Sequence, residues 1–124
     1  KASTGKHKWI ILTNRTLKYM DAEGTPVKGV WSLKGSKIER LSSGLKTGSR
    51  CGLRFSSAGE IVDFECIDKD DLRNWLNRFE VCINMANGVE TVDVEKGGNF
   101  VGERVKGQSV RCGWLKKHAL VEST

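Results

Sequence analysis

The spacing of apolar residues changes once along this chain of 124 residues, and that change limits the folds open to it. Up to residue 67, apolar side chains tend to alternate with polar ones, as on strands whose successive side chains point to opposite faces. Arg50–Ser56 is the clearest case, with Cys51, Leu53 and Phe55 on one side. From residue 68 to residue 87, apolar residues recur every three or four positions, which is the spacing of an amphipathic helix. A run of short strands followed by one helix predicts a mainly β fold.

Turn residues divide the first part of the chain into short segments. Asn14-Arg15 joins two strand-like runs in a tight hairpin, because Asn tolerates the left-handed backbone of such a turn. Further breaks lie at 21–26, at Gly35-Ser36 and in the Gly/Ser-rich stretch 42–49. Closely spaced antiparallel strands of this kind indicate a sandwich or partly open barrel. The expected strands are Trp9–Thr13, Thr16–Met20, Lys28–Leu33, Lys37–Leu41, Arg50–Ser56, Ile61–Ile67 and Ser109–Leu120.

The expected helix covers residues 68–87. Asp68 is a suitable N-cap, and Asp70 and Asp71 place negative charge on the first turn, where the helix dipole favours it. Asn87-Gly88 supplies a stop. The apolar stripe, in which Trp75 is expected to be a core residue, consists of Leu72, Trp75, Leu76, Phe79, Cys82, Ile83 and Ala86. Residues 88–108 show no sustained period and are expected to form a linker.

The net charge of +6 is unevenly distributed. Residues 1–60 carry twelve Lys or Arg against four acids, residues 61–95 three against nine, and residues 96–124 six against two. Such an uneven distribution of charge favours a basic surface that faces an anionic partner, either membrane lipid or nucleic acid. Nucleic acid is the less favoured partner, because no RNA-binding aromatic motif interleaves the lysines.

Catalysis is not indicated by any pattern in the chain. There is no paired carboxylate in an apolar setting, no defensible Ser/His/Asp order and no metal-ligand spacing, so we expect no catalytic residue, metal or cofactor. The four cysteines form no CxxC pair, which favours reduced thiols in a cytosolic protein. No apolar run approaches the roughly 20 residues of a membrane-spanning helix. The expected location is therefore cytoplasmic.

Five segments together resemble the pleckstrin homology (PH) family. Lys8–Thr13 and Thr16–Tyr19 are similar to its second and third strands, Gly29–Leu33 to its fourth, and Asp70–Leu76 to its closing helix with the characteristic tryptophan. The family's first strand, G-W-L-x-K, is matched at the other end of the chain by Gly113–Lys117. The resemblance implies a seven-stranded antiparallel β-sandwich or partly open barrel capped by one amphipathic helix.

The order of these segments predicts how one PH-like domain spans residues 1–124. Strands two to seven lie in 6–67, the capping helix in 68–87, the linker in 88–108, and the family's first strand in 109–120. The favoured explanation is a circular permutation, in which twelve residues (118–124 and 1–5) replace a family loop. A truncated second domain or strand exchange between molecules is also open. If the C-terminal strand completes the sheet in this way, Trp114 must lie in the core and Lys117 must lie on the same side of the molecule as Lys8.

The resemblance also implies a headgroup site for phosphoinositides. Lys117 matches a first-strand lysine, Lys6 and Lys8 a basic pair opening the second strand, Tyr19 a phosphate-binding tyrosine, and Lys28 a basic position in the next strand. These cations are lysines, and a lysine cannot bind a phosphate through two parallel hydrogen bonds as an arginine can. Lys116 and His7 are expected to be headgroup-binding residues as well, with His118 beside the site. Nonspecific attraction to the membrane is expected from Lys1, Lys46 and Arg50.

The expected function is therefore a membrane-targeting module without catalysis. It would bind phosphoinositide lipids of the cytoplasmic leaflet and associate peripherally with that membrane. The alternative is a scaffold or adaptor domain that binds a protein partner, with little or no lipid binding. We expect a monomer, with a strand-swapped dimer as the second arrangement.

Overall fold

The computed structural model describes residues 6–41, 51–89, 91–93, 98–100 and 109–118. Most of the elements expected from the sequence are present, with bounds that differ by a few residues. The strands are β1 (Lys6–Thr13), β2 (Thr16–Met20), β3 (Val27–Ser32), β4 (Lys37–Arg40), β5 (Gly52–Ser57), β6 (Glu60–Glu65), β7 (Thr91–Asp93), β8 (Gly98–Phe100) and β9 (Ser109–Lys117), and the helix is α1 (Lys69–Ala86).

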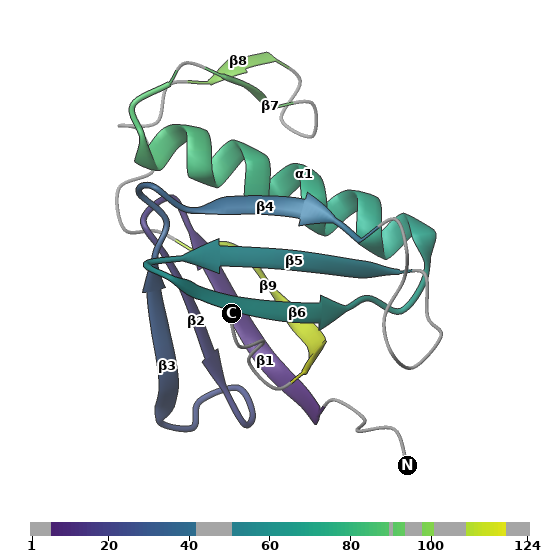
Figure 1. Cartoon of the computed structure of the whole chain (residues 1–124). Coiled ribbons are helices and arrows are strands. Elements are labelled where there is room, and N and C mark those ends of the chain that lie inside the picture. Colours follow the sequence, from purple (N-terminus) through teal and green to yellow (C-terminus); the bar gives the residue numbers. More distant parts are fainter. Residues whose placement is uncertain (1–5, 42–50, 90, 94–97, 101–108, 119–124) are drawn as a thin grey trace.

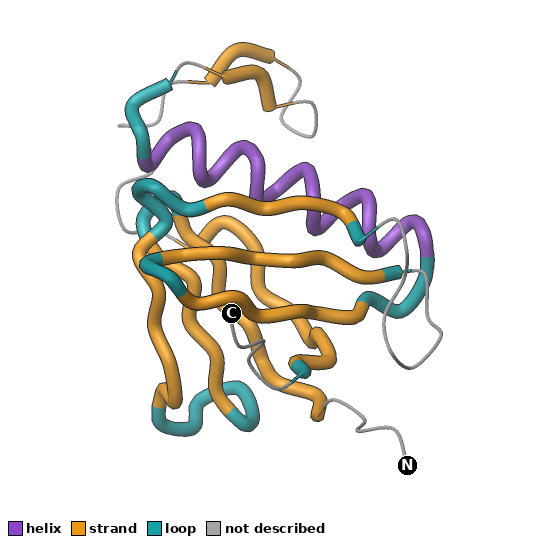
Figure 2. Tube along the Cα trace, viewed as in Figure 1, coloured by secondary structure: helices purple, strands orange, loops and turns teal. Residues whose placement is uncertain are grey.

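Seven strands form one antiparallel sheet in the order β3-β2-β1-β9-β6-β5-β4. The sheet folds into two halves: β4, β5 and β6 run across the view of Figure 1, and β1, β2 and β3 run at a steep angle to them. The helix α1 lies along β4, at one side of the strands, as the tube in Figure 2 shows. The protein is thus mainly β, and its seven strands and single helix fit the expected PH-like sandwich.

The last strand, β9, lies in the middle of this sheet. It pairs with β1 along almost its whole length, from Lys6 opposite Lys117 to Thr13 opposite Ser109. Only its end pairs with β6, where Phe64 lies opposite Lys117. The two ends of the described chain therefore meet as neighbouring strands, in the position that the expected order left vacant.

The sequence interpretation placed Trp114 in the core, and this prediction was wrong. Trp114 is 44% exposed and packs edge-on against Trp9, with 5.3 Å between ring centroids. The buried residue is its neighbour Leu115, which is 1% exposed. Because side chains on a strand alternate between faces, Gly113 and Leu115 face the interior and Trp114 faces outward. The requirement set for Trp114 is therefore not met, whereas Lys117 lies on the same face as Lys8, as required. The strand still completes the sheet, because Leu115 fills the core position that the sequence interpretation gave to Trp114.

The helix covers the interior as its sequence pattern predicted. The Asp68 side chain caps its first turn by accepting a hydrogen bond of 2.8 Å from the backbone N–H of Asp71. Trp75 is 1% exposed and Phe79 is fully buried. The core that they share with the sheet consists of Ile10, Leu12, Leu17, Leu33, Leu53, Phe55, Val62, Phe64, Cys66, Leu72, Cys82, Ile83 and Leu115.

The stretch 88–108 was expected to lack regular structure, and that expectation needs correction. It contains β7 and β8, which pair with Thr91 opposite Phe100 and Asp93 opposite Gly98. Strands of three residues are too short for an alternating pattern to emerge from the sequence. Residues 90, 94–97 and 101–108 of this stretch lie outside the described residues.

Close packing of helix on sheet makes Gly113 a test of the fold. A Cβ at this position would lie 3.1 Å from Cζ2 of the buried Trp75. We expect Gly113→Val to lower the free energy of unfolding by about 1–3 kcal/mol, because the ring or β9 must shift. Ser32→Val introduces the same valine side chain at an exposed strand position. This control should change the free energy of unfolding by less than about 0.5 kcal/mol. Equal urea midpoints for the two variants would contradict this packing.

Candidate functional site

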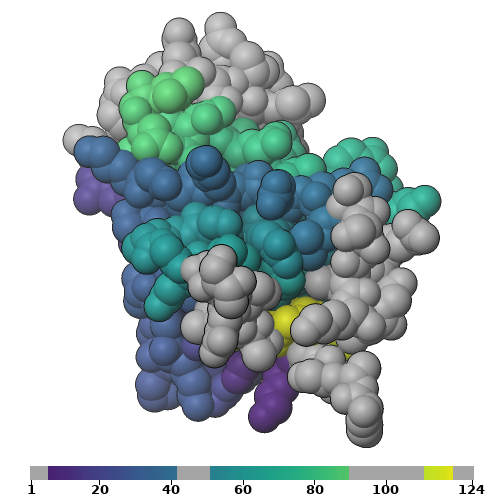
Figure 3. Space-filling model, in the orientation of Figure 1, coloured from purple at the N-terminus to yellow at the C-terminus, as the bar shows by residue number. Residues whose placement is uncertain are grey.

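A group of lysines gathers where β1 and β9 leave the core. Lys6 and Lys117 are cross-strand partners, and Lys8 lies one step further in, opposite Leu115. Lys8 continues the inward face of β1 that Ile10 occupies deeper in the core, and its side chain is only 18% exposed. The strand thus opens with cations on the same face on which it later buries apolar residues. In Figure 3, β1 (purple) and the β2–β3 region (blue) meet at the lower edge of this view.

Tyr19 supplies the aromatic side of the site. Its ring stacks on Trp31 at 5.4 Å, and the Lys117 Nζ lies 4.8 Å from the centroid of the Tyr19 ring. The ring lies over Gly29, its cross-strand partner, where a Cβ would collide with it. Glycine at position 29 therefore makes room for Tyr19, and Tyr19 in turn places an aromatic face beneath Lys117.

Lys28 reaches the same region through an irregularity in the β2–β3 ladder. Tyr19 pairs with Gly29 but Met20 pairs with Val27, so Lys28 is the extra residue of a β-bulge. A bulge changes the direction of the side chain it carries. The Lys28 Nζ lies 3.1 Å from Oδ2 of Asp21, directly after β2. Here we call Lys6, Lys8, Lys28 and Lys117, together with Tyr19, the lysine cup.

Asp21 is the member of this region that sequence reasoning missed. Its Oδ1 accepts a hydrogen bond of 2.6 Å from the Lys8 Nζ, so that its two oxygens contact two lysines. The hairpin register holds the signal that could have found it. Trp9 pairs with Met20, so the next position along places Lys8 beside Asp21. The bonds from Lys8 and then Lys28 hold the pKa of Asp21 below its ordinary value.

Lys117 is in a different electrostatic situation. Partial burial, and secondly the positive charge of Lys8, lower its pKa from the ordinary lysine value. Among the described residues no carboxylate forms an ion pair with it. The charged form of a lysine that is partly buried and close to another positive charge is stabilised when an anion binds beside it. This is the property expected of an anion-binding group.

His7 and Lys116 are not brought into the lysine cup. Each is one residue removed from a cup lysine on its strand, so each projects from the opposite face of the sheet. Both line a small hollow of about 140 Å³ next to Trp114 and Ile67. His118 turns toward β6, where its Nε2 lies 3.2 Å from Oε1 of Glu65. Lys1, Lys46 and Arg50 lie outside the described residues.

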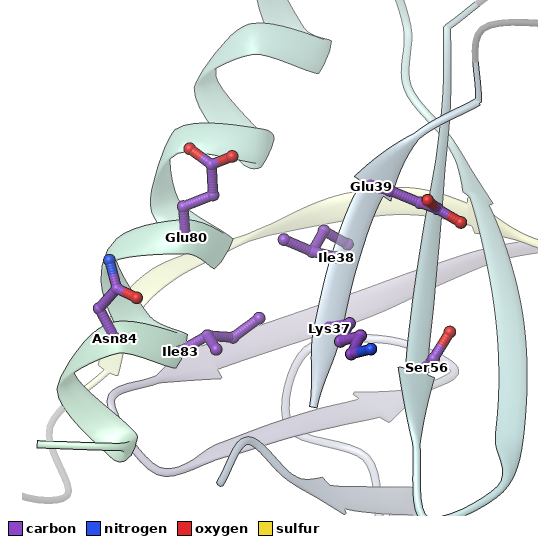
Figure 4. A pocket seen from close by; sticks show the side chains of 7 residues that line it. All are labelled: Lys37, Ile38, Glu39, Ser56, Glu80, Ile83 and Asn84. Carbon is purple, nitrogen blue, oxygen red and sulfur yellow. The ribbon is translucent and has the colours of Figure 1, made fainter. Parts of the chain in front are cut away.

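A second hollow lies between the edge strand β4 and the helix. It has a volume of about 630 Å³ and a mixed apolar and charged lining. Figure 4 shows Ile38 on β4 and Ile83 on α1 between the strand and the helix, with Glu80 and Asn84 on the helix. The remaining lining residues are Lys37, Glu39 and Ser56. No residue of the lysine cup contributes to this hollow.

In the part of the chain that the structure describes, His, Cys, Asp and Glu side chains form no group of three suited to hold a metal ion. None of its helices is long and apolar enough to span a bilayer. All four cysteines are thiols, and burial raises the pKa of the Cys66 thiol.

No protein-family model, curated protein or solved structure matches the chain.

The electrostatic coupling between Lys8 and Lys117 can be measured directly. Lys8→Met removes one of the two causes that depress the Lys117 pKa, so we expect this pKa to rise toward the ordinary lysine value. Its titration can be followed by NMR of the lysine side-chain ε-methylene and ammonium groups. Lys37→Met, on β4 outside the cup, serves as the matched control and should leave the Lys117 pKa where it is. An unchanged value in Lys8→Met would show that the two ammonium groups do not sense each other.

Proposed function

We propose that this protein is a non-catalytic module that binds the inositol phosphate headgroup of phosphoinositides in its lysine cup. Membrane attachment at the cytoplasmic leaflet follows from that recognition. The single observation that carries the proposal is the meeting of lysines from distant parts of the chain: Lys8 and Lys28 share the Asp21 carboxylate, and Lys117 lies close enough to Lys8 to sense its charge.

The chemistry of the cup suits a multiply phosphorylated sugar. Such a headgroup presents several anionic oxygens close together, so its recognition requires several cations that face one space, with neutral donors to orient it. Lys6 and Lys117 offer positive charge on neighbouring strands, and the Tyr19 hydroxyl offers a neutral donor. Lys8 and Lys28 add two further ammonium groups. Two adjacent strands and a bulge hold these groups in place.

The sheet order agrees with the PH-like interpretation. Starting at β9 and continuing through β1, β2 and β3, the neighbours follow the sequence of strands that the resemblance assigned to the family's first four. The resemblance assigns headgroup contacts to Lys6, Lys8, Lys28, Lys117 and Tyr19, and these five residues lie on the four strands of this series. Lys116 and His7 do not belong to this set, because they lie on the other face.

Alanine substitutions test the cup. We expect Lys8→Ala and Lys117→Ala each to weaken binding to phosphatidylcholine vesicles containing phosphatidylinositol bisphosphate by about 3- to 10-fold, since each removes one charge-assisted contact. Lys37→Ala removes the same charge from β4 and is the matched control, which should bind as the unmodified protein does. Cosedimentation with the vesicles measures all three, and circular dichroism verifies that each variant is folded. Equal binding by all three variants would remove the lysine cup as the site.

Alkaline pH provides a second test, through Lys117. An anion binds its protonated form, whose pKa is lowered in the unliganded protein by burial and by Lys8. Affinity for inositol hexakisphosphate should therefore fall as the pH rises through this lowered pKa, earlier than an ordinary lysine would cause it to fall. In Lys117→Arg the guanidinium stays charged throughout, so this fall should be reduced. Identical titration-calorimetry pH profiles for the two proteins would exclude Lys117 from the contact.

The hollow beside β4 favours a second candidate, an interaction domain for an extended peptide. Within the described residues β4 pairs only with β5, so its other edge can accept a further strand. Ile38 and Ile83 supply an apolar floor, and Lys37 and Glu80 supply charge on either side. A peptide added there would lie against the helix. The lysine cup would take no part in its recognition.

Amide NMR separates the two candidates in one titration. Inositol hexakisphosphate should shift the amides of β1 and the end of β9 if the lysine cup is the binding site. Shifts confined to β4 and to α1 around Ile83, or no shift at all, would contradict the lipid proposal. The signals of Ser56 and Glu80, which line the other hollow, provide the internal reference.

A further inference from the structure

Part of the lysine cup is already occupied by an anion that belongs to the protein. Asp21 contacts Lys8 through Oδ1 at 2.6 Å and Lys28 through Oδ2 at 3.1 Å. The two ammonium groups thus lie on the two oxygens of one carboxylate, much as they would lie on two oxygens of a phosphate. Lys117, by contrast, has no such partner among the described carboxylates. The cup therefore has one compensated side and one open side.

The arrangement differs from an incidental surface pair in two respects. First, Lys8 is largely covered and has limited freedom to turn away, since its side chain is only 18% exposed. Second, Lys28 is carried on a β-bulge beside Asp21, although its own side chain is 54% exposed. A phosphate that binds both lysines comes to lie next to the Asp21 carboxylate, because each ammonium group already gives one of its three donors to that carboxylate. The two anions repel each other, so the phosphate binds best when the carboxylate moves away.

We propose that Asp21 is a built-in competitor for phosphate in the lysine cup and sets its affinity for phosphorylated ligands. The inference rests on the function proposed above. Displacing a carboxylate from two lysines offsets part of the gain that the ligand makes with them. Asp21 itself is half exposed, so it can move into solvent when a phosphate replaces it. The ligand class favoured is one with at least two phosphates, one that contacts Lys117 and one that replaces Asp21 on Lys8 and Lys28.

A purely structural role for Asp21 predicts the opposite behaviour. If the carboxylate mainly holds two mutually repelling lysines together, its removal would separate them and weaken binding. If it acts only through its net charge, any nearby carboxylate would have the same effect. Glu23 provides that comparison, because it is exposed in the same β2–β3 connection and forms no ion pair with the described lysines. Asp21→Asn and Glu23→Gln change the net charge equally.

The test is a double-mutant cycle with titration calorimetry, using inositol hexakisphosphate as the probe. We expect Asp21→Asn to raise affinity by about 3- to 10-fold over Glu23→Gln, in line with a pair of partly exposed ion pairs. Lys28→Ala should cost less than about 2-fold in the unmodified background, and less than Lys8→Ala, because Lys28 is both engaged by Asp21 and more exposed to solvent than Lys8. In the Asp21→Asn background the same change should cost about 5-fold or more, because Lys28 then serves only the ligand.

The outcomes separate this inference from the function on which it rests. Equal affinities for Asp21→Asn and Glu23→Gln, a loss of affinity in Asp21→Asn, or additive effects in the cycle would overturn the competitor role while leaving headgroup binding intact. Absence of probe binding in every variant, with all of them folded by circular dichroism, would overturn the proposed function and the competitor role together.

Discussion

The pairing of β9 with β1 is the interaction on which the rest of the structure depends. Eight residues of the first strand find partners in the last, and through β9 the β1–β3 half of the sheet is joined to the β4–β6 half. Without it, β1 and β6 would expose unpaired edges, and Trp75 would lose the strand that it packs against. Closing the sheet from the far end of the chain also brings Lys6 and Lys117 together, so stability and the candidate site have the same origin.

The alternation of side chains along β9 then decides which of its consecutive residues faces the interior and which faces the surface. A shift of one residue along β9 separates Leu115, which seals the core, from Trp114, which lies on the outer face beside Trp9. The same alternation separates Lys117 in the cup from Lys116 outside it. Motif matching treated these neighbours as one block. A β-strand sends them to opposite sides of the sheet, where one serves the interior and the other the surface.

Charge in the cup is distributed unevenly, and this asymmetry gives the site its character. Lys8 and Lys28 share the carboxylate of Asp21, whereas Lys117 rests against the Tyr19 ring, with a pKa lowered by burial and by Lys8. Because nearby carboxylates neutralise only part of the positive charge of these lysines, the binding of a phosphate beside them would be favourable. The second hollow, beside β4, has both signs of charge in its lining and no such concentration.

The sequence by itself determined the local elements: a period of two up to residue 67, a period near 3.6 across α1, the Asp68 cap and the buried Trp75. Its resemblance to a known pattern also predicted that the last strand completes the sheet. Only the tertiary structure decided which face of that strand is buried, because a lone strand's alternation does not say which side meets the core. The contact of Asp21 with both lysines was decided there too, because it depends on the bulge at Lys28, which no local pattern encodes.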